Sequence, residues 1–139
     1  MTAEDLDRVC ELENACFTSA WSRESIEFEL TQNAFCRPFV LEEDGRIEGF
    51  AFLWVMFEQA QLADIGIDPD ARRKGYGHQM MDALIAQARE EECEILTLEV
   101  RPSNTAAKTL YERHGFTPLR RVKSYYSDGE DAEVMGLGL

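Results

Sequence analysis

The chain has 139 residues, and its hydrophobic fraction of 45% and aromatic fraction of 10% are ordinary for a globular protein with one core. Its formal net charge is −13, from 27 acidic and 14 basic residues, and this surplus argues against general nucleic-acid binding because phosphates would be repelled. The longest apolar run, about residues 49–57, is far shorter than the ~20 residues that span a bilayer. The acidic start, MTAEDLDRVCELE, does not resemble a secretory signal. We therefore expect one domain over residues 1–139, located in the cytoplasm and without a membrane partner.

The four cysteines form no Cys-x-x-Cys pair and no metal-site spacing with the two histidines. We expect buried or half-buried free thiols and no bound metal. The acidic surplus would attract a cationic partner, such as an amine or a basic polypeptide end, or would serve solubility alone. Composition leaves both possibilities open. The basic triplet Arg72-Arg73-Lys74 is the local exception.

The first half of the chain predicts two helices followed by antiparallel strands. An apolar stripe predicts a helix over residues 4–15, and Ser22 is placed to cap a second helix that carries Ile26, Phe28 and Leu30. A turn at residues 43–46 predicts a hairpin. The expected strands are residues 39–42, 47–57 and 62–67.

The second half predicts alternating strands and helices. Methionine and aliphatic residues recur at helical spacing over residues 80–88, after the loop at residues 75–77. Ser103 could cap a helix over residues 104–114 that ends at Gly115. Further strands are expected at residues 95–100, 116–122 and 132–137. This order predicts an α/β (α+β) fold in which a mixed, mostly antiparallel sheet carries helices on both faces.

Residues 62–77 combine a strand, a short loop with two glycines and the first turn of a helix. A helix N-terminus leaves N–H groups unpaired and carries partial positive charge. Gly75 and Gly77 would let these amides approach a diphosphate closely. The loop lacks the Lys-Ser/Thr pair of a P-loop and the full G-x-G-x-x-G fingerprint. By itself, the pattern fits a phosphate site and a solvated turn equally well.

The spacing Arg72-x-x-Gly75-x-Gly77 matches the Q/R-x-x-G-x-G/A signature of the GCN5-related N-acetyltransferase (GNAT) superfamily, which the chain resembles over nearly its whole length. The resemblance implies the GNAT fold and acetyl-CoA as cosubstrate. Residues 72–77 would hold the pyrophosphate, and residues 65–67 would contact the pantetheine through their backbone. The cofactor-binding residues implied in this way are Ile65, Gly66, Ile67, Arg72, Arg73, Lys74, Gly75, Tyr76, Gly77, Asn104 and Tyr111.

Three further stretches resemble the RimI-type ribosomal-protein alanine N-acetyltransferases: Trp21-Ser22 after Phe17, residues 98–104, and residues 125–135. The resemblance implies that the acceptor is a protein N-terminal amine, such as that of a basic ribosomal protein. Trp21, Tyr125 and Tyr126 would line the acceptor groove. Two departures are a longer segment at residues 18–20 and a first strand that is shortened or absent. A lysine side chain, a small amine and a non-catalytic acyl-CoA-binding module remain alternatives.

Acetyl transfer to an amine needs a base and an acid. A protein α-amino group has a pKa of ~8 and attacks a thioester only when neutral. Alternation places Glu99 on one face of its strand with Ile95 and Thr97, where its carboxylate could accept the ammonium proton, directly or through a water. The resemblance implies that Tyr111, two helical turns after Asn104, protonates the leaving thiolate. An ordinary strand-end charge and an ordinary core tyrosine are the structural alternatives.

Overall fold

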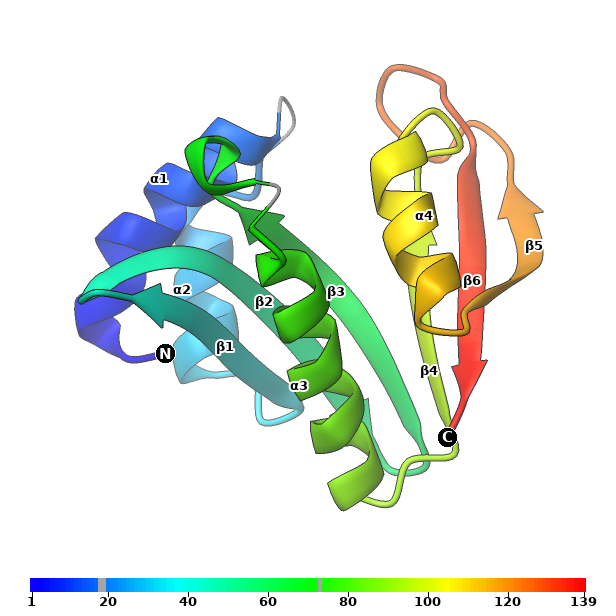
Figure 1. Cartoon of the computed structure of the whole chain (residues 1–139), viewed down its shortest axis with the longest axis horizontal. Coiled ribbons are helices and arrows are strands. Elements are labelled where there is room, and N and C mark those ends of the chain that lie inside the picture. The colour runs from blue at the N-terminus through cyan, green and yellow to red at the C-terminus, as the bar shows by residue number, and fades with distance from the viewer. Residues whose placement is uncertain (18–19, 73) are drawn as a thin grey trace.

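The computed structural model describes residues 1–17, 20–72 and 74–139 (Figure 1). In chain order the elements are the short 3-10 helix η1 (Ala3–Asp5), α1 (Leu6–Cys16), α2 (Arg23–Thr31), β1 (Cys36–Glu43), β2 (Arg46–Met56), β3 (Gln59–Ile67), the 3-10 helix η2 (Pro69–Ala71), α3 (Tyr76–Glu90), β4 (Ile95–Val100), α4 (Thr105–Arg113), β5 (Thr117–Val122) and β6 (Ala132–Gly138). This order confirms the predicted mixed α/β class. Within the described part of the chain, every helix is too short or too polar to span a membrane.

The six strands form one sheet in the order β1-β2-β3-β4-β6-β5. Every neighbouring pair is antiparallel except β3 and β4, so the predicted mixed and mostly antiparallel sheet is confirmed. The parallel pair extends only from Gln59 opposite Ile95 to Leu62 opposite Leu98. Beyond these pairs the two strands diverge (Figure 1). We call this divergence the fork.

Helices cover both faces of the sheet, as expected. On one face, α1 and α2 pack on β1 and β2, and Phe50 and Phe52 of β2 are buried there. On the other face, α3 and α4 contribute to the larger cluster, in which Ala51 and Leu53 of β2 lie. The α1 side and the α4 side of the sheet are named below after these helices.

A β-bulge changes the facing of β3 just before the fork. Leu53 of β2 pairs with Leu62, but its neighbour Phe52 pairs with Asp64, so Ala63 has no partner residue on β2. An extra residue reverses the alternation of side chains that follow it. Asp64 therefore faces the α1 side together with Phe52, and Ile65 faces the α4 side.

Two of the predicted helix-capping residues are found in the structure, and one is not. Ser22 caps α2 by accepting the Ser25 N–H at 3.1 Å, as predicted. Gly115 follows α4 with φ of 94°, as a residue of left-handed conformation does after a helix. The cap of α4, however, is Asn104, whose Oδ1 accepts the Ala107 N–H at 3.2 Å, whereas Ser103 contacts Glu130 instead.

The apolar residues of α2 are not all buried. Phe28, one of the three expected on this helix, has a side chain that is 50% exposed. Ile26 and Glu29 are the buried residues of α2. The Glu29 carboxylate accepts hydrogen bonds from Trp54 Nε1 at 3.0 Å and from Asn33 Nδ2 at 2.6 Å. The hydrogen-bonded Glu29 therefore lies on the buried face of α2, and Phe28 does not.

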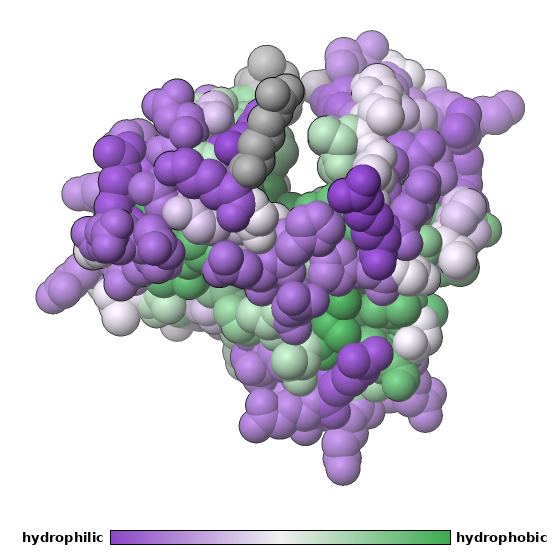
Figure 2. Space-filling model, viewed as in Figure 1, coloured by the Kyte–Doolittle hydropathy of each residue, from purple (hydrophilic) through white to green (hydrophobic). Residues whose placement is uncertain are grey.

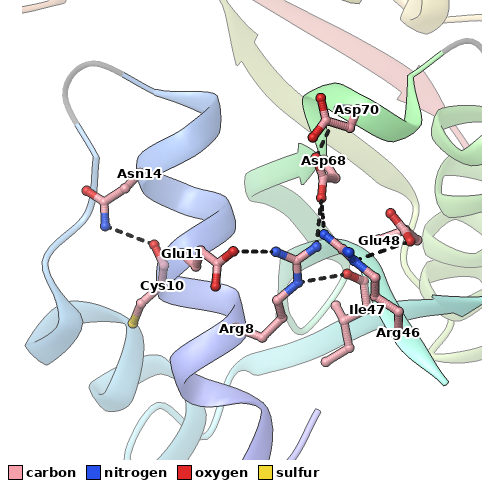
Figure 3. Close-up of polar contacts among 9 residues, drawn as sticks. All are labelled: Arg8, Cys10, Glu11, Asn14, Arg46, Ile47, Glu48, Asp68 and Asp70. Carbon is pink, nitrogen blue, oxygen red and sulfur yellow. Dashed lines mark hydrogen bonds and ion pairs between the residues drawn. The ribbon is translucent and has the colours of Figure 1, made fainter.

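An arginine on α1 fixes the path of the chain as it leaves β3 (Figure 3). Arg8 donates from Nε to the Ile47 carbonyl at 3.0 Å and from Nη2 to Asp68 at 2.7 Å. Asp68 also accepts the Asp70 N–H at 2.9 Å, which caps η2. The segment that leads to residues 72–77 is thereby fastened to α1.

Candidate active site

A cleft of about 1100 Å³ lies at the fork. Its walls come from both diverging strands, from α1, from the first turn of α3, from α4 and from the hairpin between β5 and β6. Figure 2 shows the molecule hollowed between the part that carries α1 and the part that carries α4. The predicted site residues that line the cleft are Trp21, Ile65, Gly66, Ile67, Arg72, Gly75, Tyr76, Gly77, Glu99, Asn104, Tyr111, Tyr125 and Tyr126.

Two predicted residues of the basic triplet are not among these. Lys74 is exposed and does not belong to the cleft wall, so the structure does not bring it together with the other predicted residues. Arg73 lies outside the described residues, as do Thr18 and Ser19 of the lengthened segment. Arg72 is exposed and reaches the cleft.

Gly75 and Gly77, at the start of α3, are required for two different structural reasons. Gly75 is the N-cap residue, with φ of 80°, a conformation that L side chains rarely adopt. It turns the chain so that the unpaired N–H groups of the first helical turn lie at the cleft. Gly77 is inside the helix, where an added Cβ would lie 3.2 Å from Leu110 of α4. Gly77 therefore allows α3 and α4 to approach closely.

Tyr111 approaches the fork from the α4 side. It is 6% exposed, its ring lies 6.0 Å from that of Phe116, and it belongs to the cluster between α3, α4 and the sheet. Burial, with a smaller contribution from the negative charge of Asp64, raises the pKa of the phenol. Tyr111 therefore remains protonated at neutral pH and can donate a hydrogen bond or a proton into the cleft.

Glu99 approaches the fork from the opposite face. Leu96, Leu98 and Val100 of β4 are buried on the α4 side, so alternation places half-buried Glu99 on the α1 side, as predicted. The Tyr125 hydroxyl donates a hydrogen bond to the Glu99 carboxylate, which raises the pKa of Tyr125 to about 12. The structure thus joins the predicted base to a residue predicted only to line the groove.

The two tyrosines of the hairpin are held by contacts that the sequence did not reveal. Tyr125 and Tyr126 meet edge to face with ring centroids 5.0 Å apart. The Arg101 guanidinium lies 4.0 Å from the Tyr126 ring centroid and forms ion pairs with Asp128 at 2.8 Å and Glu130 at 3.0 Å. The residues lie far apart in the chain, and only opposite charges hinted at their contact.

Trp21 closes the α1 side of the cleft. Its ring stacks on Phe52 at 5.6 Å with an interplanar angle of 20°, and its backbone N–H donates to Glu13 Oε1 at 2.9 Å. Glu13 is buried, lines the cleft and contacts Asp64. Neither Glu13 nor Asp64 was among the predicted site residues. A charged residue on the apolar stripe of α1 was the one sequence signal.

The two histidines form a pair beside the cleft, which His78 lines. His78 Nδ1 and His114 Nε2 are 3.0 Å apart, and the ring centroids are 5.1 Å apart. His78 belongs to the first turn of α3, and His114 is the C-terminal cap residue of α4. The pair adds a polar contact beside Gly77 where the two helices approach.

The geometry described above agrees with one known family. The family model described as "Acetyltransferase (GNAT) family" matches residues 6–116. This chain belongs to the GNAT family. Membership confirms the superfamily predicted from the glycine loop, and the chain is an N-acetyltransferase.

Individual relatives agree with this assignment. The GNAT chain is 37% identical over 136 residues to a putative [ribosomal protein bS18]-alanine N-acetyltransferase of Bacillus subtilis (strain 168), covering 97% of this chain and 90% of that protein. The crystal structure of the ribosomal-protein-S18-alanine N-acetyltransferase from Escherichia coli has a TM-score of 0.92 and 33% identity, covering 99% of this chain and 90% of that one. A GNAT acetyltransferase from Elizabethkingia anophelis with acetyl-CoA bound shares the fold, with a TM-score of 0.79, 20% identity, and coverage of 93% of this chain and 89% of that one.

Proposed function

We propose that this GNAT enzyme transfers the acetyl group of acetyl-CoA to the α-amino group of a protein N-terminus, with the N-terminal alanine of ribosomal protein bS18 as the acceptor. The observation that carries the proposal is the fork cleft, which is lined from both faces of the sheet. Relatives that match nearly the whole chain and are named as bS18-alanine N-acetyltransferases support the choice of acceptor.

The α4 side of the cleft fits acetyl-CoA. The N-terminus of α3, opened by the left-handed conformation of Gly75, presents backbone N–H groups and partial positive charge suited to a pyrophosphate. Past Leu62, β3 has no partner on the edge that faces β4. Its backbone over residues 65–67 can therefore pair with the amides of a pantetheine arm. Arg72 adds positive charge at the same wall.

The α1 side fits a peptide end. Trp21 supplies an apolar wall, and Tyr125 and Tyr126 supply ring faces and hydroxyls opposite it. Glu99 also lines the cleft, so an ammonium that enters from this side can reach a carboxylate. The chain's net charge of −13 favours a basic polypeptide as partner.

The proposed chemistry divides between two residues on opposite faces. Bound acetyl-CoA supplies the acetyl group as a thioester. Glu99 takes the proton that the ammonium loses, and the hydrogen bond from Tyr125 orients its carboxylate. The freed amine attacks the carbonyl carbon, the C–N bond forms and the C–S bond breaks. The nitrogen loses a second proton to solvent, and this proton restores the Tyr111 phenol after that group has protonated the sulfur. Tyr111, kept protonated by burial, donates its proton to the departing sulfur.

The test is thiol release from acetyl-CoA with four matched acceptors. These are a peptide that begins Ala-Arg, the same peptide with its N-terminus blocked, a blocked peptide with one internal lysine, and spermidine. We expect turnover with the first alone, and mass spectrometry should place the acetyl group on the alanine nitrogen. Turnover on the blocked lysine peptide or on spermidine instead would replace the proposed acceptor. CoA binding without turnover on any amine would overturn the catalytic proposal.

A further inference from the structure

Two buried carboxyl groups meet on the α1 side of the fork. Glu13 is 1% exposed, and its carboxyl group contacts that of Asp64. Glu13 Oε2 and Asp64 Oδ2 are both buried, and apart from this mutual contact neither has a hydrogen-bond partner in the described part of the chain. Two ionised carboxylates have only acceptors. The contact therefore requires one proton between the two groups.

The other oxygen of each carboxyl is tied to the backbone. Glu13 Oε1 accepts the Trp21 N–H at 2.9 Å, and Asp64 Oδ1 accepts the Ile65 N–H at 3.0 Å. The pair thus forms a continuous link from β3, through α1, to the segment that carries Trp21. Phe52, on which the Trp21 ring stacks, is the residue of β2 that pairs with Asp64. The link and the stacked rings meet at one point of the sheet.

This meeting depends on the bulge at Ala63. Without the extra residue, Asp64 would alternate with Leu62 and face the α4 side, away from Glu13. The pair also lines the cleft.

We propose that Asp64 is a positioning residue for the acceptor site, because the proton it shares with Glu13 clamps Glu13 in the orientation that holds the backbone of Trp21 beside the incoming amine. The proposal deepens the proposed function and rests on it. The proposed clamp acts through Glu13 and Trp21 and requires no contact between Asp64 and either reactant. Loss of the proton would leave two buried like charges that repel, and the link to Trp21 would loosen.

The groups around the pair support retention of the proton. Burial, and then the contact with Glu13, raise the pKa of Asp64 far above its ordinary value. On α1, Cys16 interacts with Glu13 and Asp64 and also with Arg72 of the loop after η2. From α4, Tyr111 faces Asp64 and is neutral at physiological pH. The clamp is therefore closed at neutral pH and opens in alkaline solution.

Two substitutions separate a clamp from a merely structural residue. In Asp64→Asn the amide Nδ2 donates to Glu13 without a titratable proton, whereas Asp64→Ala has no donor. At pH 7 we expect the acceptor KM of the Asn variant to stay within about twofold of the original, and that of the Ala variant to rise about tenfold, the cost of one lost buried hydrogen bond. The Kd for CoA, measured by calorimetry, should stay unchanged in both.

The pH dependence gives a second readout. From pH 7 to pH 9.5 we expect the acceptor KM of the original enzyme to rise more steeply than that of Asp64→Asn. An Ala variant with an unchanged acceptor KM, or an Asn variant that loses as much as the Ala variant, would overturn the clamp. A parallel loss of CoA affinity would also overturn it, because the defect would then be structural.

A further measurement does not depend on the acceptor. Hydrogen exchange at the Trp21 amide should be faster in Asp64→Ala than in Asp64→Asn at pH 7, with exchange in α3 unchanged as the control. If no peptide is acetylated by the original enzyme, the proposed function fails while this exchange difference still tests the clamp. Equal exchange at Trp21 in both variants would reject it.

Discussion

The guanidinium of Arg101 lies 4.0 Å above the ring centroid of Tyr126. The same guanidinium forms ion pairs with Asp128 and Glu130, and Glu130 in turn accepts the N–H and hydroxyl of Ser103. One side chain therefore fastens the end of β4 to the hairpin that carries the two tyrosines. The orientation of the acceptor side depends on this fastening.

Arg101→Gln is expected to raise the acceptor KM several-fold. The substitution removes a cation–π contact worth about 0.5–1 kcal/mol and two partly exposed ion pairs worth about 0.2–1 kcal/mol each. The Kd for CoA should not change, because the hairpin is on the other side of the fork. Arg121→Gln, which removes two ion pairs of β5, with Asp131 and Glu133, is the matched control. Equal effects of the two substitutions would contradict the role of Arg101.

Glu99→Gln is expected to lower kcat/KM by about 10²–10⁴-fold at pH 7, the usual contribution of a general base. The loss should shrink as pH rises above ~8, because the acceptor amine is then already neutral. Steady-state kinetics between pH 6 and pH 9.5 would measure this. Glu112→Gln, on the exposed surface of α4, serves as the control. A loss that is constant across the pH range would argue against proton abstraction by Glu99.

Tyr111→Phe is expected to lower kcat by at least about 10²-fold while CoA affinity and melting temperature stay close to the original. The phenyl ring fills the same buried space, so the packing against Phe116 persists. Since burial raises the pKa of Tyr111, its titration should not appear as an alkaline limb below pH 10. Pre-steady-state kinetics should locate the loss in the chemical step. Retention of full kcat, with chemistry still rate-limiting, would exclude the acid role.

Gly75→Ala is expected to weaken CoA binding about five- to tenfold. A left-handed conformation costs an L residue about 1–2 kcal/mol, and the backbone can relieve this by moving the first N–H groups of α3. Gly45→Ala is a matched control, since Gly45 has φ of 79° in the turn between β1 and β2. Both variants should lose similar stability, but only the first should lose CoA affinity in calorimetry. Equal CoA affinities would mean that the loop does not hold the pyrophosphate.

Arg8→Ala is expected to lower the free energy of unfolding by about 1–3 kcal/mol at pH 7, because Asp68 loses a hydrogen-bonded charge partner. The Asp70 N–H and the Arg8 side chain lower the pKa of Asp68 below its ordinary value. A depressed pKa gives stability that is present above the unfolded value of ~3.9 and lost as pH falls. The free energy of unfolding, measured with urea, should therefore differ less between the variant and the unsubstituted protein at pH 3 than at pH 7.

The control for this substitution is Arg23→Ala, which removes an exposed ion pair with Asp7. Exposed pairs contribute about 0–1 kcal/mol, so its effect should be small at both pH values. If the difference in the free energy of unfolding between Arg8→Ala and the unsubstituted protein grew as the pH fell, this would contradict the assigned direction of the Asp68 pKa shift.

Local signals in the sequence predicted the elements well. The strand over residues 95–100 agrees with β4 at both ends, because dense β-branched and aliphatic residues mark a buried strand. Ser22 and Gly115 were placed correctly because capping depends on neighbouring residues. The burial of Glu29 could not be predicted, since only its distant partner Trp54 accounts for it.

The site was predicted in part. The residues that follow a family motif, such as Gly75, Glu99 and Tyr111, line one cleft as expected, although their roles remain predictions. The bulge at Ala63 could not be predicted, because it exists only in the register between β2 and β3. Asp64 was missed for this reason. The contacts of Tyr125 with Glu99 and of Arg101 with Glu130 join distant parts of the chain, and no local pattern encodes them.

The last pair of the parallel strands, Leu62 with Leu98, has a consequence for how two molecules share the protein. Because the strands separate there, we expect acetyl-CoA and the acceptor to approach from opposite faces of the sheet and to meet in the gap between β3 and β4. Neither reactant should then have to leave before the other binds, and an inhibitor that mimics one reactant should not displace the other. A single ligand in which a covalent tether joins analogues of both reactants through this gap should contact both binding surfaces at once and bind more tightly than either analogue alone.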